Sequence, residues 1–434
     1  MTNKIVHPCK SLNGAVDIPG DKSISHRALM FAPLALGTSV IDNLLEGHDC
    51  MATLQVMRGL GAHIELSNNQ WLIHGQGARS LKEPSSVLDC KNSGTTIRLL
   101  AGLMSAMPFM SILDGSDQVK SRPMGRVIKP LSAMSAQIFG RQNNQLAPLV
   151  CLPSQLHGGR FRLEQKSAQV KSALILAGLF ADSDTLITNT QASRDHTEIM
   201  LLYMGAPIKS DQDSVLVRPL SQELSPLQIS IPGDISSAAF LLVAGALRAA
   251  QPITLYSVGV NPTRTGIIDA LRIMGADLQL GRHKIVGGEQ VADLTIGRAQ
   301  LKGAVFAGDH VVRMIDEIPV LALAATQAQG TTVIKDAAEL KVKESNRIAK
   351  TVELLSSLGA NISETDDGMI IHGPSKLHGG EVSSYGDHRL ALMMSIAGLV
   401  ASGPVKVNQT AVTDDSFPGF FASLKKLGAS VSEA

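Results

Sequence analysis

The sequence predicts a two-domain α/β protein assembled from six copies of one α/β unit, and three observations support this fold class. A three-residue motif, here called a mark, consists of Leu or Met, then Gly or Ser, then Ala, and it recurs every 69 to 84 residues. Each copy reads as strand, helix, strand, helix, and the mark closes a helix before a strand. Ile-Pro-Gly-Asp also occurs twice. The six marks are Leu60-Gly61-Ala62, Met134-Ser135-Ala136, Met204-Gly205-Ala206, Met274-Gly275-Ala276, Leu358-Gly359-Ala360 and Leu427-Gly428-Ala429.

The repeated Ile-Pro-Gly-Asp segments, at 18–21 and 231–234, divide the six copies into three and three. Pro followed by Gly ends one element and lets the chain change direction. We therefore expect a first domain over 21–231, a second domain over 1–20 plus 233–434, and a two-stranded hinge where the chain crosses. Closure about this hinge would bring helix starts onto one small ligand. The alternative is a duplicated fold whose Pro-Gly pairs are simply loops.

Bulk composition fits two cores and excludes several partners. The 434 residues are 44% hydrophobic but only 3% aromatic, so the cores must consist of Ala, Leu, Ile, Val and Met. The 39 basic and 38 acidic residues leave a net charge of +1, which argues against a nucleic-acid surface or an anionic membrane as the partner. The N-terminus lacks an apolar signal region and no apolar run is long enough to span a bilayer. We expect a cytoplasmic protein.

The four cysteines and the common motifs give no sign of a cofactor. Cys9, Cys50, Cys90 and Cys151 form no Cys-x-x-Cys pair, so neither a zinc site nor a disulfide framework is indicated. There is no Walker A sequence, no Gly-x-Gly-x-x-Gly turn and no His-Glu-x-x-His. We expect no cofactor and no metal.

Cations and hydroxyls gather where apolar helices begin. Unpaired backbone N–H groups and the helix dipole make a helix start an anion site, and Lys or Arg placed there adds full charge. One such start alone could equally be a capped, solvated helix, but the construction repeats. The cations concerned suffice for two phosphates and two carboxylates, which predicts a small polyanionic substrate. They are Lys22, Arg27, Arg98, Arg122, Arg194, Lys343, Arg347 and Arg389.

Two carboxylates stand out for proton transfer. Asp316 opens an apolar helix, where an N-cap role is the structural alternative. Glu344 lies with Lys343 and Arg347 in a segment that we expect to form one helical turn. Surrounding cations keep one carboxylate ionised as a base, while burial prepares another as an acid. The residues alone thus indicate group transfer between small anions.

Seven motifs follow one another along the chain: Asp21 to Arg27, Asn92-Ser93-Gly94-Thr95, Ser121-Arg122-Pro123-Met124, Ser167-Ala168-Gln169, Arg194 to Glu198, Val342 to Arg347 and Asp387-His388-Arg389. In this order, and across the whole chain, they resemble the 5-enolpyruvylshikimate-3-phosphate synthase family. The residues of several motifs are similar to those of the divergent second class of that family. The resemblance implies an inside-out α/β barrel fold with two domains of three βαβαββ units.

The resemblance implies an activity and a set of site residues. Phosphoenolpyruvate would give its enolpyruvyl group to the 5-hydroxyl of shikimate 3-phosphate, with release of phosphate, by addition and elimination. Asp316 would be the base and Glu344 the proton donor, with Lys22 as an alternative donor. Shikimate 3-phosphate would meet Lys22, Ser23, Arg27, Ser167, Ala168, Gln169, Ser193, Arg194, Asp316 and Lys343. Phosphoenolpyruvate would meet Lys22, Gly94, Arg122, Gln169, Arg347 and Arg389.

Two positions differ among members of the family. Many members carry a Lys before a Thr-Phe-Pro sequence, and the matching stretch here is Asp414-Asp415-Ser416-Phe417-Pro418, without that cation. Some members of the second class have Ala where this chain has Gly94. We expect Gly94 to leave room for glyphosate, a mimic of phosphoenolpyruvate.

Two alternatives remain at this stage. A sister enzyme transfers enolpyruvyl to UDP-N-acetylglucosamine on the same six-unit fold, but it depends on a Cys in a mobile basic loop that this chain lacks. A non-catalytic protein that closes on a polyanion would use the same cations and release no phosphate. The family implies a monomer.

Overall fold

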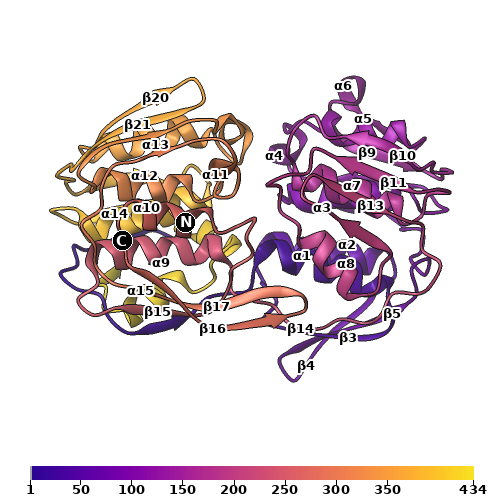
Figure 1. The fold of residues 1–434 in the computed structure, drawn as a ribbon, viewed down its shortest axis with the longest axis horizontal. Coiled ribbons are helices and arrows are strands. Elements are labelled where there is room, and N and C mark those ends of the chain that lie inside the picture. The colour runs from indigo at the N-terminus through magenta and orange to yellow at the C-terminus, as the bar shows by residue number, and fades with distance from the viewer. Residues whose placement is uncertain (1) are drawn as a thin grey trace. The chain divides into compact units, whose positions relative to one another are not determined.

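The computed structural model describes residues 2–434 as two compact units, each with its own core (Figure 1). The first unit comprises Gly20–Ile231 together with Val286–Glu289. The second unit comprises the residues up to Pro19, Pro232–Ile285 and Gln290–Ala434. The sequence-based division assigns 286–289 to the second domain, whereas their contacts group them with the first unit. Ile229 and Ile199 of that unit lie against Gly287 and Gly288.

Three four-stranded sheets form the first unit. In each, one end strand runs parallel to its neighbour and the other two pairs are antiparallel. The sheets, in spatial order, are β14 (Gln228–Ser230), β3 (Leu36–Asp42), β5 (Gln70–Gln76) and β4 (His63–Ser67); β6 (Leu88–Asp89), β7 (Ser111–Asp114), β9 (Leu146–Leu152) and β8 (Gln137–Gly140); and β10 (Gly159–Arg162), β11 (Thr185–Thr188), β13 (Ser214–Val217) and β12 (Ile208–Ser210).

The other three sheets repeat this pattern, with a parallel end pair and an antiparallel pair beside it. Two of their strands, β1 and β2, come from the N-terminal segment, so this segment belongs to the core of the second unit. The sheets are β2 (Ala15–Asp17), β15 (Ile253–Gly259), β17 (Glu289–Ile296) and β16 (Leu278–Val286); β18 (Val305–Phe306), β19 (Gly330–Ile334), β21 (Gly368–Gly373) and β20 (Asn361–Thr365); and β22 (Gly380–Ser383), β23 (Val405–Asn408), β1 (Lys4–Val6) and β24 (Val431–Glu433).

Six inner helices, three in each unit, are buried along most of their length. Their sequences are rich in Ala, Leu, Ile and Gly, which allows close packing on every face. Polar residues lie in the first turns of five of them, α12 being the exception among the described residues. The inner helices are α1 (Lys22–Phe31), α3 (Gly94–Met104), α7 (Ala168–Gly178), α9 (Ile235–Arg248), α12 (Ile318–Thr326) and α14 (His388–Val400).

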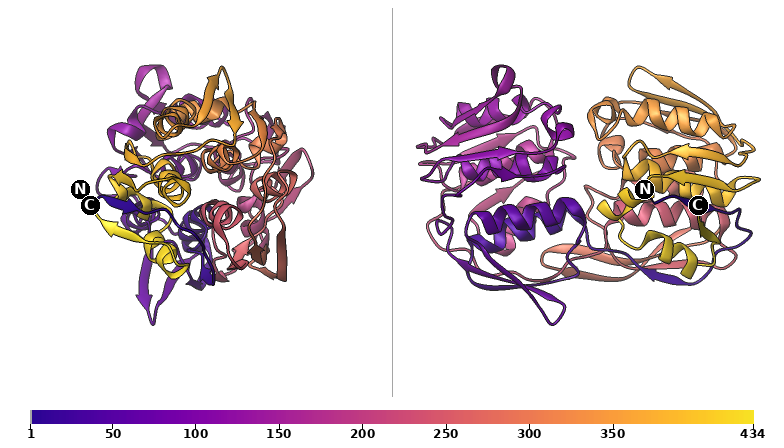
Figure 2. Two further views of the ribbon diagram at one scale, coloured as in Figure 1. Left: turned by 90° about the vertical axis from the view of Figure 1, so that its left-hand side faces the viewer. Right: turned by 180° about the vertical axis from the view of Figure 1, so that it is seen from behind.

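The remaining helices are less completely buried than the six inner helices, and Figure 2 shows the ribbon from two further sides. Each of the six marks directly follows one of these helices, namely α2, α5, α8, α10, α13 or α15. These helices are α2 (His48–Gly59), α4 (Asp117–Lys120), α5 (Gly125–Ala133), α6 (Arg141–Asn144), α8 (His196–Tyr203), α10 (Gly266–Ile273), α11 (Asp309–Val312), α13 (Arg347–Ser357) and α15 (Phe420–Lys426), with 3-10 turns at Ala32–Leu34, Ala338–Val342 and Thr410–Asp415.

The six marks close helices as predicted. In every copy the middle residue has a positive φ, from 69° at Ser135 to 101° at Gly428. The following Ala donates its N–H to a carbonyl five residues back, for example Ala62 to Met57 at 3.0 Å. This is the Schellman ending, in which a left-handed residue turns the chain out of the helix. The observation confirms the six repeats.

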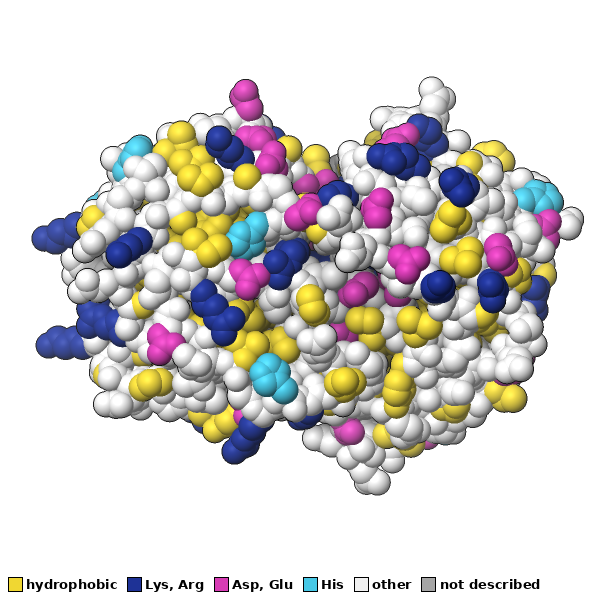
Figure 3. Space-filling model, in the orientation of Figure 1, with side chains coloured by type: hydrophobic (Ala, Val, Ile, Leu, Met, Phe, Trp, Pro, Cys, Tyr) yellow, Lys and Arg dark blue, Asp and Glu magenta, His cyan; other side chains and the backbone are white. Residues whose placement is uncertain are grey.

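The surface carries both signs of charge. Figure 3 shows Lys and Arg interspersed with Asp and Glu on the face in view, as expected for a net charge of +1. Among residues 2–434, none of the helices has the length and apolarity needed to cross a membrane.

Candidate active site

The start of α1 in the first unit presents the most informative motif of the sequence. Asp21 caps the helix, because its side chain accepts a hydrogen bond from the Ile24 N–H at 2.9 Å. Lys22 follows at the first helical position and its Nζ lies 2.6 Å from Asp49 Oδ2, with both side chains 17% exposed. Ser23 is half-buried beside it. Asp49, on α2, is a partner that sequence reasoning missed.

Arg27 lies one turn further along α1 and is buried. Its Nε donates to Thr197 Oγ1 at 2.7 Å and its Nη2 donates to Ser172 Oγ at 2.9 Å. Its Nη1 donates to the Ser23 carbonyl at 2.9 Å. Burial, only partly offset by Glu198, lowers the pKa of Arg27 to about 10. The guanidinium therefore ties α1 to α7 and α8 through hydroxyl groups.

A second group of predicted residues meets at the start of α3. Arg98 Nη1 donates to Gln169 Oε1 at 2.7 Å, and Gln169 Nε2 donates to Thr95 Oγ1 at 3.1 Å. Arg122 points at the same helix start, because a Cβ added to Gly94 would lie 2.9 Å from Arg122 Nη1. The structure thus brings together Gly94, Arg122 and Gln169, three residues that the family resemblance assigns to one ligand.

The start of α3 is held by a chain of hydrogen bonds that the sequence did not reveal. His26 Nδ1 lies 2.7 Å from Thr53 Oγ1, which lies 2.6 Å from Thr96 Oγ1. Thr96 Oγ1 donates to Ser93 Oγ at 2.7 Å, and Ser93 caps α3. Burial lowers the pKa of His26 to about 3, so its imidazole is neutral. This chain fixes α1, α2 and α3 against one another.

Ser167, Ala168 and Gln169 form the first turn of α7, and all three are half-buried. Ser193 is buried and donates its hydroxyl to the Thr190 carbonyl at 2.6 Å, while Arg194 is half-buried.

A buried ion pair between α7 and α8 was not singled out by the sequence. Lys171 Nζ lies 2.6 Å from Glu198 Oε1, and each side chain is 2% exposed. The same ammonium donates to the Ser193 carbonyl at 3.3 Å. The pair therefore connects the start of α7 to the loop that carries Ser193 and Arg194.

The second unit gathers the two candidate proton-transfer residues around Arg347. Asp316 Oδ1 lies 3.1 Å from Arg347 Nη1 and 3.6 Å from Lys343 Nζ, and its Oδ2 lies 3.8 Å from Arg389 Nη2. Glu344 Oε2 lies 2.5 Å from Arg347 Nη2. Asp316 precedes the cap of α12, which is Glu317, so Asp316 is not itself the N-cap.

Asp387 completes this cluster, although the sequence marked it only as part of a motif. Its carboxylate caps α14 by accepting from the Arg389 N–H at 2.9 Å. It also accepts from Arg347 Nε at 2.8 Å. Burial opposes ionisation of Asp387, but the charge of Arg347 holds the pKa of that carboxyl below its usual value. Burial likewise disfavours the charged Arg347, yet the three carboxylates raise its pKa.

The local backbone around Glu344 differs from the expectation. The sequence predicted one helical turn containing Lys343, Glu344 and Arg347. The 3-10 turn ends at Val342 instead, Lys343 is extended, and α13 begins at Arg347 after the cap Asn346. Asn346 accepts from the Ala349 N–H at 3.2 Å and so starts a new helix. The three side chains meet through this connector.

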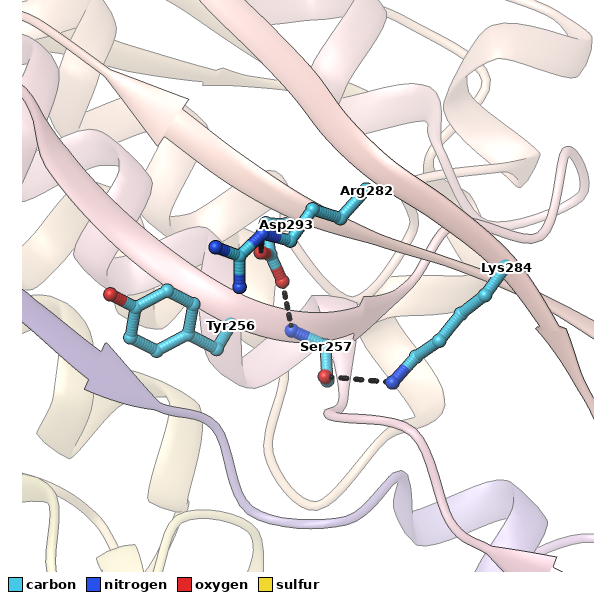
Figure 4. Close-up of a pocket in the computed structure, with 5 residues that line it drawn as sticks. All are labelled: Tyr256, Ser257, Arg282, Lys284 and Asp293. Carbon is cyan, nitrogen blue, oxygen red and sulfur yellow. Dashed lines mark hydrogen bonds and ion pairs between the residues drawn. The ribbon is translucent and has the colours of Figure 1, made fainter.

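A surface cavity of about 310 Å³ lies elsewhere in the second unit, and no predicted site residue lines it (Figure 4). Asp293 Oδ1 accepts from the Ser257 N–H at 2.8 Å, and Lys284 Nζ donates to Ser257 Oγ at 3.2 Å. These bonds hold the irregular stretch of β15 between Leu255 and Val258. The polar groups thus have a structural role, and we place the candidate site at the helix starts.

Comparisons with known proteins identify the family of the chain. The chain matches the family EPSP synthase (3-phosphoshikimate 1-carboxyvinyltransferase) over residues 6–424. It is 49% identical to the 3-phosphoshikimate 1-carboxyvinyltransferase of Desulforudis audaxviator, covering 98% of this chain and 99% of that relative. The enzyme of the same name from Bacillus subtilis is 48% identical over 96% of this chain and 98% of its own length.

Solved structures give the same result. The EPSP synthase from Acinetobacter baumannii superposes with a TM-score of 0.90 at 40% identity, covering 100% of both chains. The enolpyruvyl transferase NikO from Streptomyces tendae gives a TM-score of 0.81 at 18% identity, covering 100% of this chain and 98% of that one, which shows the fold alone. The predicted inside-out α/β fold is therefore confirmed, and the chain belongs to the EPSP synthase (3-phosphoshikimate 1-carboxyvinyltransferase) family.

Proposed function

We propose that this protein transfers the enolpyruvyl group of phosphoenolpyruvate to the 5-hydroxyl of shikimate 3-phosphate and releases phosphate. C3 of the enol accepts a proton while the hydroxyl oxygen, losing its own proton, attacks C2. The resulting tetrahedral ketal phosphate then breaks its C2–O bond to phosphate and returns a C3 proton. The double bond between C2 and C3 is restored, now as the vinyl ether of the product, and no electrons are gained or lost, so the reaction needs no redox cofactor.

The observation that carries the proposal is the position of Asp316 among three cations. Arg347, Lys343 and Arg389 all lie within 4 Å of its carboxylate. Neighbouring cations stabilise a negative charge, so a carboxylate in this setting suits the role of base for the 5-hydroxyl. Glu344 also contacts Arg347, and the family mechanism makes it the candidate proton donor, with Lys22 as the alternative.

The binding roles are proposals that follow from family membership and from the geometry of each unit. Phosphoenolpyruvate is assigned to Lys22, Gly94, Arg122, Gln169, Arg347 and Arg389. Shikimate 3-phosphate is assigned to Lys22, Ser23, Arg27, Ser167, Ala168, Gln169, Ser193, Arg194, Asp316 and Lys343. Arg27 and Arg347 are only 3% and 1% exposed. We propose that these two also orient their hydrogen-bonded neighbours.

The division into two domains of three repeats, hinged at 18–21 and 231–234, is part of the same proposal. The two Ile-Pro-Gly-Asp segments support it, because each caps an inner helix through its Asp. We also propose a cytoplasmic monomer, as the family resemblance implies. Light scattering of the purified chain should give the mass of one chain.

Phosphate release tests the proposed reaction. Purified protein receives phosphoenolpyruvate with shikimate 3-phosphate, or with UDP-N-acetylglucosamine, without added metal or nucleotide. We expect phosphate release in the mixture that contains shikimate 3-phosphate and none in the mixture that contains UDP-N-acetylglucosamine. Release with the nucleotide sugar alone would assign the sister reaction, and binding of both anions without release would make the protein a polyanion-binding module.

A further inference from the structure

We propose that a divalent first-row transition ion, such as Zn²⁺, binds to His63, Glu65 and His74 on the β4–β5 hairpin. One imidazole nitrogen from each histidine and one carboxylate oxygen lie within 4.8 Å of one another. Imidazole and carboxylate are the ligands that Zn²⁺ takes in three-ligand sites whose fourth position is open to water. We call these residues the hairpin cluster, and none of them belongs to the candidate active site.

The register of the hairpin creates the cluster. Asn68 and Asn69 have φ values of 49° and 65°, so together they make the two-residue turn that joins β4 to β5. This turn pairs Ser67 with Gln70 and thereby places His63 directly opposite His74. Glu65 is two residues after His63, so its side chain lies on the same face of the sheet.

The separations between donor atoms suit one small ion. Two ligand atoms that are each about 2.1 Å from a tetrahedral Zn²⁺ lie about 3.4 Å apart. His74 Nε2 lies 3.2 Å from Glu65 Oε1, and His63 Nε2 lies 4.0 Å from Glu65 Oε2. The two rings stack, with their centroids 4.6 Å apart. Small rotations of exposed side chains would therefore complete the site.

A neighbouring hydroxyl orients one of the ligands. Thr38 on β3 lies beside His74, and its Oγ1 is 3.0 Å from His74 Nδ1. When His74 Nδ1 carries the proton and donates it to that hydroxyl, Nε2 keeps a lone pair that can bind an ion shared with Glu65. A hydrogen bond of this kind to the second ring nitrogen fixes the orientation and tautomer of a metal-binding histidine.

The second unit contains a natural comparison. His372 on β21 lies 3.0 Å from Thr331 Oγ1, which repeats the pairing of His74 with Thr38. Opposite His372, however, stands Asn361, and Ser363 occupies the place of Glu65. The Thr–His pair therefore recurs with the fold, whereas the other two ligands are specific to the β4–β5 hairpin.

The location indicates what the ion would do. β4 is the edge strand of its sheet, and the hairpin projects beyond the helices of the first unit (Figure 1, Figure 2). An ion shared by β4 and β5 would cross-link the two strands and slow their local opening. The expected effect is stabilisation of this hairpin, separate from the proposed reaction.

Calorimetric titration with Zn²⁺ tests the site on the full chain after treatment with a chelator. We expect one Zn²⁺ per chain on the hairpin, slower amide exchange over 63–74 when Zn²⁺ is present, and no binding of Mg²⁺. His63→Ala should abolish this binding, and Thr38→Val should weaken it about tenfold. His372→Ala is the matched control and should leave it unchanged.

The proposal is overturned by any of three results. These are the absence of Zn²⁺ binding, equal binding by the His63→Ala protein, or slower exchange that spreads over the whole chain rather than the hairpin. Circular dichroism of each variant checks that the exposed substitutions leave the fold intact.

Discussion

Arg347 and Asp387 form a two-point ion pair in the interior of the second unit. Arg347 Nε donates to Asp387 Oδ2 at 2.8 Å, and Nη2 donates to Oδ1 at 3.2 Å. The Arg347 side chain is 1% exposed and that of Asp387 is fully buried. Because Asp387 also caps α14, this pair fixes the start of α14 relative to the start of α13. The pair thus positions Arg389 beside Asp316.

Asp387→Asn should strongly destabilise the second unit. The amide removes a buried negative charge and one of the three carboxylates that contact Arg347, at a cost of about 1.5–3 kcal/mol for the charged hydrogen bonds lost. Urea unfolding followed by circular dichroism measures the loss. The exposed pair of Lys350 and Glu353 on α13 supplies the control, since Glu353→Gln should change stability by less than about 0.5 kcal/mol. A loss below about 1 kcal/mol for Asp387→Asn would contradict this role.

His26 should make stability depend on pH. Its pKa is about 3 in the folded protein and about 6.5 in the unfolded chain. Between these values the unfolded chain binds more protons, so stability falls as the pH is lowered, by up to about 1.4 kcal/mol per unit. His26→Gln should flatten the unfolding free energy between pH 6.5 and 4 relative to wild type, whereas the exposed His378→Gln should not. Parallel curves for wild type and His26→Gln would refute the assignment.

Ser135 is the one mark of the six without glycine, and its φ of 69° is unfavourable for a residue with a Cβ. Ser135→Gly should stabilise the protein by about 0.5–1 kcal/mol in urea unfolding. Gly205→Ser is the reverse change at a site where an added Cβ meets nothing within 4 Å, so it isolates the backbone cost. It should destabilise by a similar amount, and changes of the same sign in both variants would argue against the account.

Gly94→Ala should alter the use of phosphoenolpyruvate and of its mimic glyphosate. The new Cβ would lie 2.9 Å from Arg122 Nη1 and 3.2 Å from Arg98 Nη1, so both guanidinium groups must shift. We expect a higher KM for phosphoenolpyruvate and weaker inhibition by glyphosate than in the wild type. Steady-state kinetics measures both, and unchanged inhibition would remove Gly94 from the binding site.

Local features were predictable from the sequence, and contacts distant in the chain were not. The helix starts at Lys22, Gly94 and Ala168 and the six closing marks follow from capping and turn chemistry, which act over a few residues. The pairing of Lys22 with Asp49 and of Lys171 with Glu198 depends on packing between helices, for which the sequence carries no periodic signal.

The hairpin cluster is another group of contacts that was not predicted from the sequence. The Asn68-Asn69 turn places His63 opposite His74, but neither histidine lies in a sequence motif with metal-ligand spacing, so the pattern alone does not indicate the cluster. The burial of Arg27 and Arg347 was also not predicted from the sequence. Arg27 and Arg347 stay predicted ligand-binding cations, and the structure shows that most of their hydrogen-bond donors contact neighbours within their own units.

Deuterium incorporation tests the central claim most directly. In D₂O, with phosphoenolpyruvate and shikimate 3-phosphate, addition and elimination pass through a methyl group at C3, so the product should carry deuterium in its vinyl group. Phosphate and this product should form in equal amounts, and Asp316→Asn should slow both together. Phosphate release without deuterium in the product, or full activity of the Asp316→Asn protein, would contradict the mechanism.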